Sequence, residues 1–346
     1  MRYYDIQIFT RPDVKKGLPA KLFRQYSSLR NGVFNPGNLM VEFDIHRFEE
    51  STPQNETLIT IWGISPEEMQ QARQNMFGMT LKMSVGMSKG LPLANAGHQG
   101  LVLEGTIWQV IGNWQGTELR LDLIVTASPV STTDMRPLAP LNLTLPWEKG
   151  RKLSNALFDC LRILGDYHFS ISISDRLVNN FDNPMFCGSM TELARQLKKT
   201  SKNIIREPWY SGVVITMVNA KTIRVFDNDV EYHPDKGNKS AFYRSQNPKQ
   251  ILFTDLIGQP AWVTFGKVSI PCVMRNDIQV GDYIRMPEKM MPMVRASSYS
   301  QFREDAAFTG EFCVSSVRLI GNSRQPDANS WITLIEAYPV GENIET

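Results

Sequence analysis

The sequence predicts a mainly β protein: two similar small β-barrel domains in tandem, with an α+β domain between them. Three observations predict this. Short segments of alternating apolar and polar residues fill the first third, helical patterns gather in the middle, and alternating segments return in the last third. A period of two is typical of half-buried strands. We place the first barrel at 1–128, a Pro-rich linker or arm at 129–146, the α+β domain at 147–243 and the second barrel at 244–346.

The first predicted barrel holds a series of alternating segments and one helix. Ser65 is a suitable N-cap, Pro66 fits the first helical position and two glutamates follow, so a short helix is expected there. The segment GNWQG has the composition of a hairpin loop between the last two strands. The expected strands are Met40–Phe48, Thr57–Ile64, Met79–Val85, Leu101–Gly112 and Glu118–Val125.

The middle of the chain differs from the first third in its composition and in the spacing of its apolar residues. Four prolines between Ser128 and Trp147 are typical of an extended linker or arm. Helical spacing follows, and a later helix is expected to begin with a capping box and to end in a Lys-rich turn. The residues that carry these predictions are Leu153, Leu157, Cys160 and Leu164 for the first helix, Ser189 with Glu192 for the second, His168–Ile173 for a strand and Gly212–Asp227 for a hairpin.

The last third returns to strands, and its closing hairpin resembles the last hairpin of the first barrel. In both, an alternating strand that ends in an aliphatic residue is followed by Ile-Gly-Asn, at Ile111–Asn113 and at Ile320–Asn322, and then by a turn and a second alternating strand. Gly and Asn are common turn residues, so chance is one explanation of the match. A duplicated domain is the other, because each hairpin closes a β-rich segment.

Charge and motifs favour a structural role. The formal net charge is +2, which gives no global field for nucleic acid or an anionic membrane. We find no secretory signal and no apolar run long enough to cross a membrane. The four cysteines form no CxxC pair, the four histidines show no metal-ligand spacing, and neither a nucleophile elbow nor a catalytic-cysteine context is present. We therefore expect no enzyme activity and no cofactor.

The stretch MSKGLPLANAGHQG, Met87–Gly100, is rich in glycine but is not a phosphate loop. Its glycines have the wrong spacing, and a strand rather than a helix follows it. An apolar tip on a loop favours a partner surface. A methionine cluster nearer the C-terminus suggests the same, although a loop folded over its own core is an equal alternative there. The interface candidates are Leu91, Pro92, Leu93, Met290, Met291 and Met293.

Four segments of the chain are distinctive: TLITIWGISPEEM, VGMSKGLPLANAGHQGLVLEGTIWQVIGNWQGTELRLDLIV, LPWEKGRKLSNAL and the closing VSSVRLIGNSRQPDANSWITLIEAYP. Together they resemble baseplate hub proteins of contractile-tailed bacteriophages, which are related to the base of type VI secretion spikes. The resemblance covers roughly the first half of the chain and its end. It implies a homotrimer with two tube-forming barrels per chain, which adapts a six-fold tail tube to a three-fold spike.

The resemblance also implies partners and a location. The partners would be the tail tube or tube initiator protein and the central spike, with baseplate wedge or tape measure proteins as further candidates. Neither nucleic-acid specificity nor a membrane segment is expected. The location would be the virion, after assembly in the host bacterial cytoplasm, which fits a chain without a disulfide framework.

Two other functions remain open at this stage. A cell-wall hydrolase of the tail tip would need a carboxylate pair, a metal site or a triad, and the sequence shows no motif for any of them. A carbohydrate-binding module would use exposed tryptophans that stack on sugars. The candidates are Trp108, Trp114 and Trp262, of which Trp108 lies in an alternating strand and is expected in the core.

Overall fold

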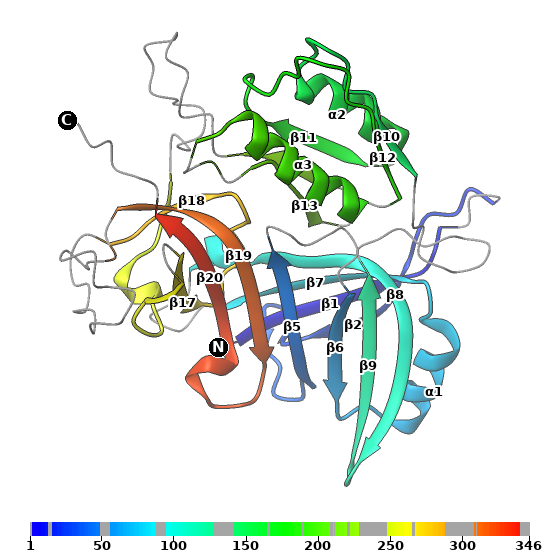
Figure 1. Ribbon diagram of the computed structural model, residues 1–346. Helices are drawn as coiled ribbons and strands as arrows, with labels where there is room; N and C mark the ends of the chain where they lie inside the picture. Colours follow the sequence, from blue (N-terminus) through cyan, green and yellow to red (C-terminus); the bar gives the residue numbers. More distant parts are fainter. Residues whose placement is uncertain are drawn as a thin grey trace. The chain divides into compact units, whose positions relative to one another are not determined.

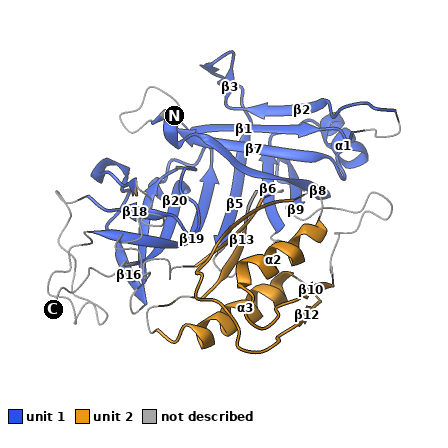
Figure 2. Cartoon of the chain, turned by 90° about the horizontal axis from the view of Figure 1, so that it is seen from above, with its two compact units in different colours: residues 1–47, 56–135, 249–346 blue, residues 48–55, 136–248 orange. Residues whose placement is uncertain are grey.

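The structure, a computed structural model, divides into two compact units (Figures 1 and 2). Unit 1 comprises Met1–Arg47, Glu56–Met135 and Lys249–Thr346, and unit 2 comprises Phe48–Asn55 and Arg136–Pro248. The structure describes residues 2–12, 16–48, 56–87, 95–126, 142–164, 167–188, 190–207, 210, 212–219, 222–227, 248–264, 267–287, 308 and 310–339.

Unit 1 is built around one 13-stranded sheet, which confirms the mainly β fold class. The strand order is β16-β17-β20-β19-β5-β6-β9-β8-β7-β1-β2, with β18 paired to β19 and β15 to β18. The strands are β1 (Arg2–Phe9), β2 (Leu22–Ser27), β5 (Met40–Phe48), β6 (Glu56–Trp62), β7 (Thr80–Met87), β8 (Gly100–Gln115), β9 (Glu118–Thr126), β15 (Lys249–Gln250), β16 (Ala261–Thr264), β17 (Lys267–Val273), β18 (Tyr283–Arg285), β19 (Glu311–Asn322) and β20 (Trp331–Pro339).

Short elements complete unit 1. The helix α1 spans Pro66–Asn75, and 3-10 turns lie at Ala96–His98, Phe253–Asp255 and Ala328–Ser330. A small hairpin joins β3 (Leu29–Arg30) to β4 (Val33–Phe34).

The alternation seen in the sequence sets which side of each strand is buried. In β1, Tyr4, Ile6 and Ile8 are fully buried, while the residues between them are partly exposed. In β7, which pairs with β1, Leu81 and Met83 are likewise fully buried. These strands therefore form a half-buried sheet of the kind the period of two predicts.

The strands of the two predicted barrels meet in this one sheet, because β5 lies beside β19. Arg318 Nε donates to Asp44 Oδ1 at 2.9 Å, and Asn322 Nδ2 donates to Glu42 Oε1 at 2.6 Å. The N-terminal and C-terminal β regions are therefore joined through paired strands, and their division into two separate barrels stays a prediction.

The Ile-Gly-Asn matches lie inside strands and not at turns. Gly112 pairs with Leu121 in the β8–β9 hairpin, and Gly321 pairs with Trp331 in the β19–β20 hairpin. The loop predicted at GNWQG was placed too early, because β8 continues to Gln115 and the chain turns after it. Glycine is common in turns, which led to the prediction of a turn here, but glycine inside a strand often marks a close approach by another group.

A side chain from another element packs directly against each of the two matched glycines. A Cβ on Gly112 would lie 2.5 Å from Met69 Sδ, and a Cβ on Gly321 would lie 2.2 Å from ring carbons of Phe43. The two hairpins thus share a packing role for their glycines, while a domain duplication stays a prediction.

Unit 2 is a small α+β fold. Its helices are α2 (Leu153–Leu161), continued by a 3-10 turn at Arg162–Leu164, and α3 (Met190–Ile204). A three-stranded sheet has the order β11 (His168–Ser172), β14 (Thr222–Phe226) and β13 (Val214–Asn219), and a two-stranded ladder pairs β10 (Leu143–Leu145) with β12 (Met185–Cys187).

The core of unit 2 uses the helix face that the sequence predicted. Leu153, Leu157 and Cys160 are buried on α2, and Leu164 is buried on the 3-10 turn. The predicted N-cap Ser189 lies outside the described residues. Its expected partner Glu192 accepts a hydrogen bond from the backbone N–H of Gly188 at 2.8 Å.

Candidate interaction surface

The β8–β9 hairpin extends beyond the neighbouring strands of unit 1 as a two-stranded ribbon (Figure 1). The pairing of β8 with β7 ends at Thr106, whereas its pairing with β9 continues to Gln115. Gly116 has φ of 62°, a conformation that glycine adopts without strain, and it makes the tight turn. The outer half of β8 therefore has a sheet neighbour on one side only.

The helix α1 packs on this ribbon, and its sequence explains where it begins. The Ser65 hydroxyl accepts from the backbone N–H of Glu68 at 3.1 Å, and Pro66 occupies the first turn, as predicted. Ala72 is fully buried on one side of the helix. Because Gly112 of β8 has no side chain, Met69 can lie directly against the strand.

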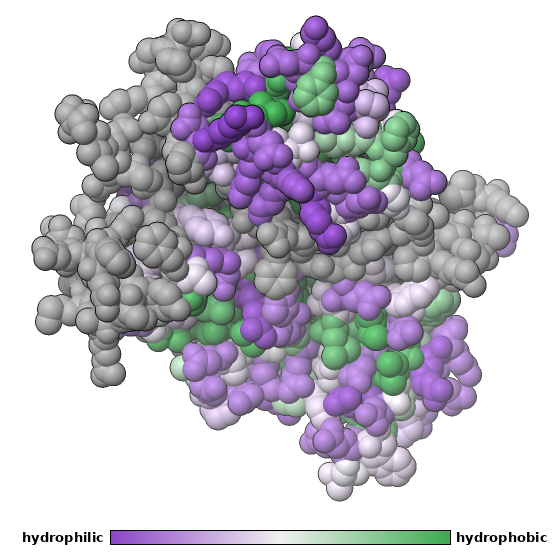
Figure 3. Space-filling model, in the orientation of Figure 1, coloured by the Kyte–Doolittle hydropathy of each residue, from purple (hydrophilic) through white to green (hydrophobic). Residues whose placement is uncertain are grey.

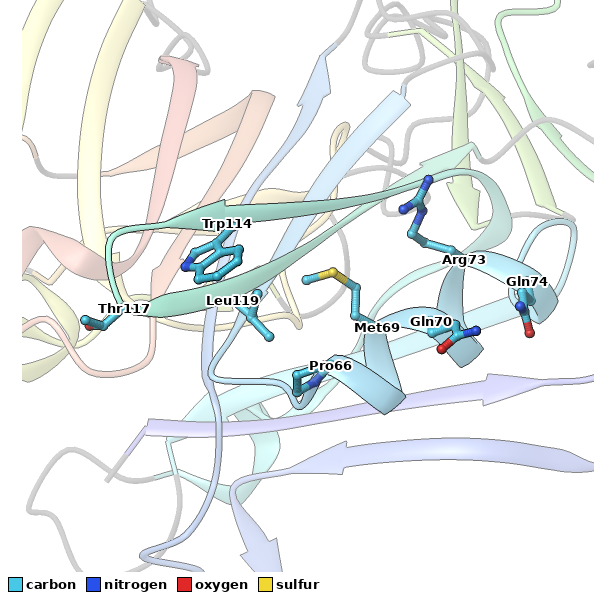
Figure 4. Close-up of a pocket in the computed structure, with 8 residues that line it drawn as sticks. All are labelled: Pro66, Met69, Gln70, Arg73, Gln74, Trp114, Thr117 and Leu119. Carbon is cyan, nitrogen blue, oxygen red and sulfur yellow. The ribbon is translucent and has the colours of Figure 1, made fainter.

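A groove of about 700 Å³ lies between α1 and the ribbon (Figure 4). Met69 and Pro66 of the helix face Trp114 and Leu119 of the ribbon, so the groove is lined mainly by apolar groups. Polar side chains complete the lining: Gln70, Arg73, Gln74 and Thr117.

Trp114 is the most exposed large apolar side chain of this surface. It is 75% exposed, and its Nε1–H donates to the carbonyl of Gly116 at 2.7 Å. The polar end of the indole is therefore satisfied within the turn, and the ring remains available for an apolar or stacking contact.

The described lining of the groove has apolar, amide, hydroxyl and guanidinium side chains, and no carboxylate, histidine or cysteine. Across the described ranges, no group of three or more His, Cys, Asp or Glu side chains is placed to hold a metal ion. The helices in those ranges are all too short or too polar to span a lipid bilayer.

The six interface candidates from the sequence, in the loops at 91–93 and 290–293, lie outside the described residues. The structure does describe both ends of the first loop. Before it, the carbonyl of Gly86 accepts from Trp331 Nε1 at 2.9 Å. After it, the carbonyl of His98 accepts from the backbone N–H of Asn276 at 3.1 Å. Both ends of the loop are thus attached to the C-terminal β region.

The His98 end adjoins a buried ionic cluster that the sequence did not reveal. Arg275, whose side chain is 2% exposed, donates from Nε and Nη2 to the two carboxylate oxygens of Asp277 at 2.9 and 2.7 Å. Its Nη1 also donates to Asp255 Oδ2 at 3.1 Å. One guanidinium therefore connects two carboxylates from different segments.

Electrostatics within the cluster favour its charged form. Burial alone would raise the pKa of Asp277, but the hydrogen bonds and charge of Arg275 outweigh it and hold that pKa below its usual value. For His98, burial and then the Arg275 charge lower the pKa. At neutral pH the cluster therefore contains an ionised Asp277 beside a neutral imidazole.

Comparisons with known proteins give likenesses of structure only. No protein-family model matches the chain, and no curated protein matches it. The 43 kDa tail protein of prophage MuSo2 from Shewanella oneidensis aligns with a TM-score of 0.47, 6% identity and 98% coverage of both chains. The tail protein from Neisseria meningitidis MC58 aligns with a TM-score of 0.46 and 10% identity, over 98% of this chain and 97% of that one. TM-scores below 0.5 do not establish a shared fold, so neither likeness bears on the function proposed below.

Sequence reasoning identified Trp114 but missed the groove beside it. The opposite wall comes from α1, which lies about 40–50 residues before Trp114, and no local pattern joins the two segments. A signal was present in the helix itself, because Pro66, Met69 and Arg73 recur at helical spacing on a side that includes only one large apolar residue. Such a helix face is typical of a surface exposed at least in part.

Proposed function

We propose that the chain is a structural component of a phage tail and, within it, the hub of a contractile baseplate. The observation that carries this proposal is the pairing of β19 with β5, which brings an N-terminal and a C-terminal β region side by side in one chain. Three copies of such a chain would present six β regions around an axis. An adaptor between a six-fold tube and a three-fold spike needs this multiplicity.

The sequence segments that resemble hub proteins support the same role. They include the β8–β9 ribbon and the closing β19–β20 hairpin, which are the two longest hairpins of unit 1 among its described strands. The proposed partners are two further copies of the chain, which form a homotrimer with it, the tail tube or its initiator, the central spike, and wedge or tape measure proteins. The proposed location is the virion baseplate, after assembly in the bacterial cytoplasm.

The test is the mass of the full chain mixed with the central spike protein of its phage, measured by light scattering during size-exclusion chromatography. We expect three copies of the chain per spike. Changing Leu91, Pro92 and Leu93 together to serine is expected to reduce the trimeric fraction, because the apolar loop tip is proposed to contact a neighbouring subunit. Replacing the exposed Lys149 with serine serves as the control.

The two parts of this proposal fail separately. Only monomer in the presence of the spike would contradict the hub role. A triple-serine variant that trimerises as well as the unaltered chain would contradict the loop contact alone. Trimerisation without the spike is not required, because a partner that binds only the assembled form shifts the equilibrium.

A carbohydrate-binding role at the tail tip is the second candidate, because one observation favours it. Of the three candidate tryptophans, Trp108 lies near Phe77 but is only partly buried, so the expectation that it lies in the core is wrong. Trp262 is also partly buried and lies near Phe308, whereas Trp114 is exposed. An exposed aromatic ring beside amide side chains could stack on a sugar and bind its hydroxyl groups.

The carbohydrate candidate predicts that Trp114→Ala abolishes binding in a screen against bacterial surface glycans, whereas Trp114→Phe retains part of it. Unaltered protein that binds no glycan in the screen would exclude this role. Equal binding by the unaltered chain and the alanine variant would place any glycan site elsewhere.

A further inference from the structure

The helix α3 presents a row of exposed cations. Arg195, Lys199 and Lys202 occupy positions i, i+4 and i+7, which lie within about 60° of one another around an α-helix. Arg206, also exposed, follows two residues after the helix ends. We call these four residues the α3 cationic stripe. In Figure 3 the surface over α3 is strongly hydrophilic.

The packing of α3 fixes the direction of this stripe. Leu193, Leu197 and Ser201 are buried, and they lie on the side of the helix opposite the stripe. Val213 donates its backbone N–H to the Ser201 hydroxyl at 2.9 Å, which further limits rotation of the helix. The cations therefore cannot turn inward without removing leucine side chains from the core.

Ion pairs within the part of the chain that the structure describes do not neutralise the stripe. Among the described residues, no carboxylate forms an ion pair with Arg195, Lys199 or Lys202. The nearest acids along the sequence are engaged elsewhere: Glu192 accepts from Gly188 and Gln196, and Glu207 pairs with Arg176. The helix dipole favours cations in the last turn, which accounts for Lys202 but not for Arg195 in the middle of the helix.

The composition of the stripe favours a phosphate backbone over a protein surface. Protein interfaces usually have an apolar, often aromatic centre and are depleted in lysine. No exposed large apolar side chain lies on the described part of α3. Rows of Lys and Arg without stacking aromatics are typical of surfaces that contact the phosphates of duplex nucleic acid and not its bases.

We infer that the α3 cationic stripe is a docking surface for the phosphate backbone of duplex nucleic acid. The contact is independent of base sequence, so it agrees with the absence of nucleic-acid specificity expected from the chain. A net charge of only +2 does not oppose it, because phosphate contacts depend on local charge. This inference does not rest on the proposed hub function.

The test uses the full chain and a short fluorescein-labelled DNA duplex of mixed sequence, with binding followed by fluorescence anisotropy over a range of salt concentrations. The variant Arg195→Gln/Lys199→Gln/Lys202→Gln removes three cations, and glutamine keeps a similar helix propensity. Each lost phosphate contact is expected to make the slope of log K against log salt shallower by about 0.9. The variant should therefore bind roughly a hundredfold or more weaker at about 0.1 M salt.

A charge-matched control separates the stripe from net charge. The variant Lys149→Gln/Lys152→Gln/Arg162→Gln removes three cations from unit 2 outside α3, and it is expected to keep most of the affinity. Circular dichroism and thermal melting confirm that all three proteins are folded. Equal binding by the two variants would overturn the inference, as would no binding of the duplex by the unaltered chain at low salt.

The same assay tests an acidic protein as the alternative occupant. Labelled poly-glutamate replaces the duplex at equal salt. Duplex binding that is tighter than poly-glutamate binding supports the inference. Poly-glutamate that binds more tightly, and loses its binding in the α3 variant, would assign the stripe to an acidic protein partner and overturn it.

Discussion

Replacing Arg275 with methionine is expected to lower the free energy of unfolding by about 3–5 kcal/mol. The guanidinium is almost fully buried and neutralises Asp255 and Asp277. Methionine fills a similar volume but leaves both carboxylates without their cation. Asp255, at 8% side-chain exposure, cannot regain full hydration. The loss therefore comes mainly from uncompensated buried charge and not from a cavity.

The measurement is urea-induced unfolding at neutral pH, followed by tryptophan fluorescence. Arg285→Met is the matched control, because Arg285 pairs with Glu311 at 2.6 Å but has a side chain that is 47% exposed. Exposed pairs of this kind contribute about 0–1 kcal/mol. Similar losses in the two variants would show that the buried cluster has no special role in stability.

The difference in the free energy of unfolding between the unaltered chain and Arg275→Met depends on pH, because the pKa of Asp277 is lowered in the folded protein. A carboxyl whose pKa is lower in the folded state contributes stability above its unfolded pKa of about 3.9, and loses it as the pH falls through the folded value. Arg275→Met removes the cause of the lowering. The gap in stability between the unaltered chain and this variant is therefore expected to be full at pH 7 and to narrow below about pH 4.

Replacing Gly321 with alanine is expected to lower the free energy of unfolding by about 3 kcal/mol, the upper end of the usual range for an overpacked core. The added Cβ would lie 2.2 Å from two ring carbons of Phe43. That ring is 5% exposed and meets Trp331 edge to face at 5.3 Å between centroids, so it has little room to move. The clash would act at the contact between β5 and β19.

Two further variants make this prediction specific. Gly258→Ala is the control, because its Cβ would meet Pro271 at an ordinary 3.5 Å, and it should change stability by less than about 0.5 kcal/mol. Adding Phe43→Leu to Gly321→Ala should recover part of the loss, since the two changes share one contact. Strict additivity of the two single changes would contradict a direct clash.

Local sequence patterns predicted many of the strands and helices of this fold. They could not predict the contacts between residues that are distant in sequence. The alternation in β5 and the Ser65 and Pro66 signals of α1 depend only on neighbouring residues. The sequence alone was therefore sufficient to predict this strand and the start of this helix. The Arg275 cluster joins segments about 20 residues apart, and the guanidinium could have had many partners. The two matched glycines were assigned to turns because turn propensity is local, whereas their real role depends on Phe43 and Met69.

The same limit applies to the candidate site. Trp114 was recognisable as a residue suited to binding, because large aromatic side chains are conspicuous in a sequence. Its exposure could not be inferred. The alternation along β8 predicts on which side of the strand a residue lies, but not whether another element covers that side. The groove exists only because α1 packs against the ribbon, and that contact depends on the tertiary fold.

The position of β5 also has a consequence for how the chain is made. Its sheet neighbour β19 lies far along the sequence, and Asp44 and Arg318 are 274 residues apart. A ribosome adds roughly 5–20 residues per second, so β19 emerges about 14–55 s after β5. During that interval one edge of β5 has no native neighbour, and an uncovered strand edge can pair with another chain. Nascent copies on one messenger are close together, so slower translation should increase the aggregated fraction of this protein.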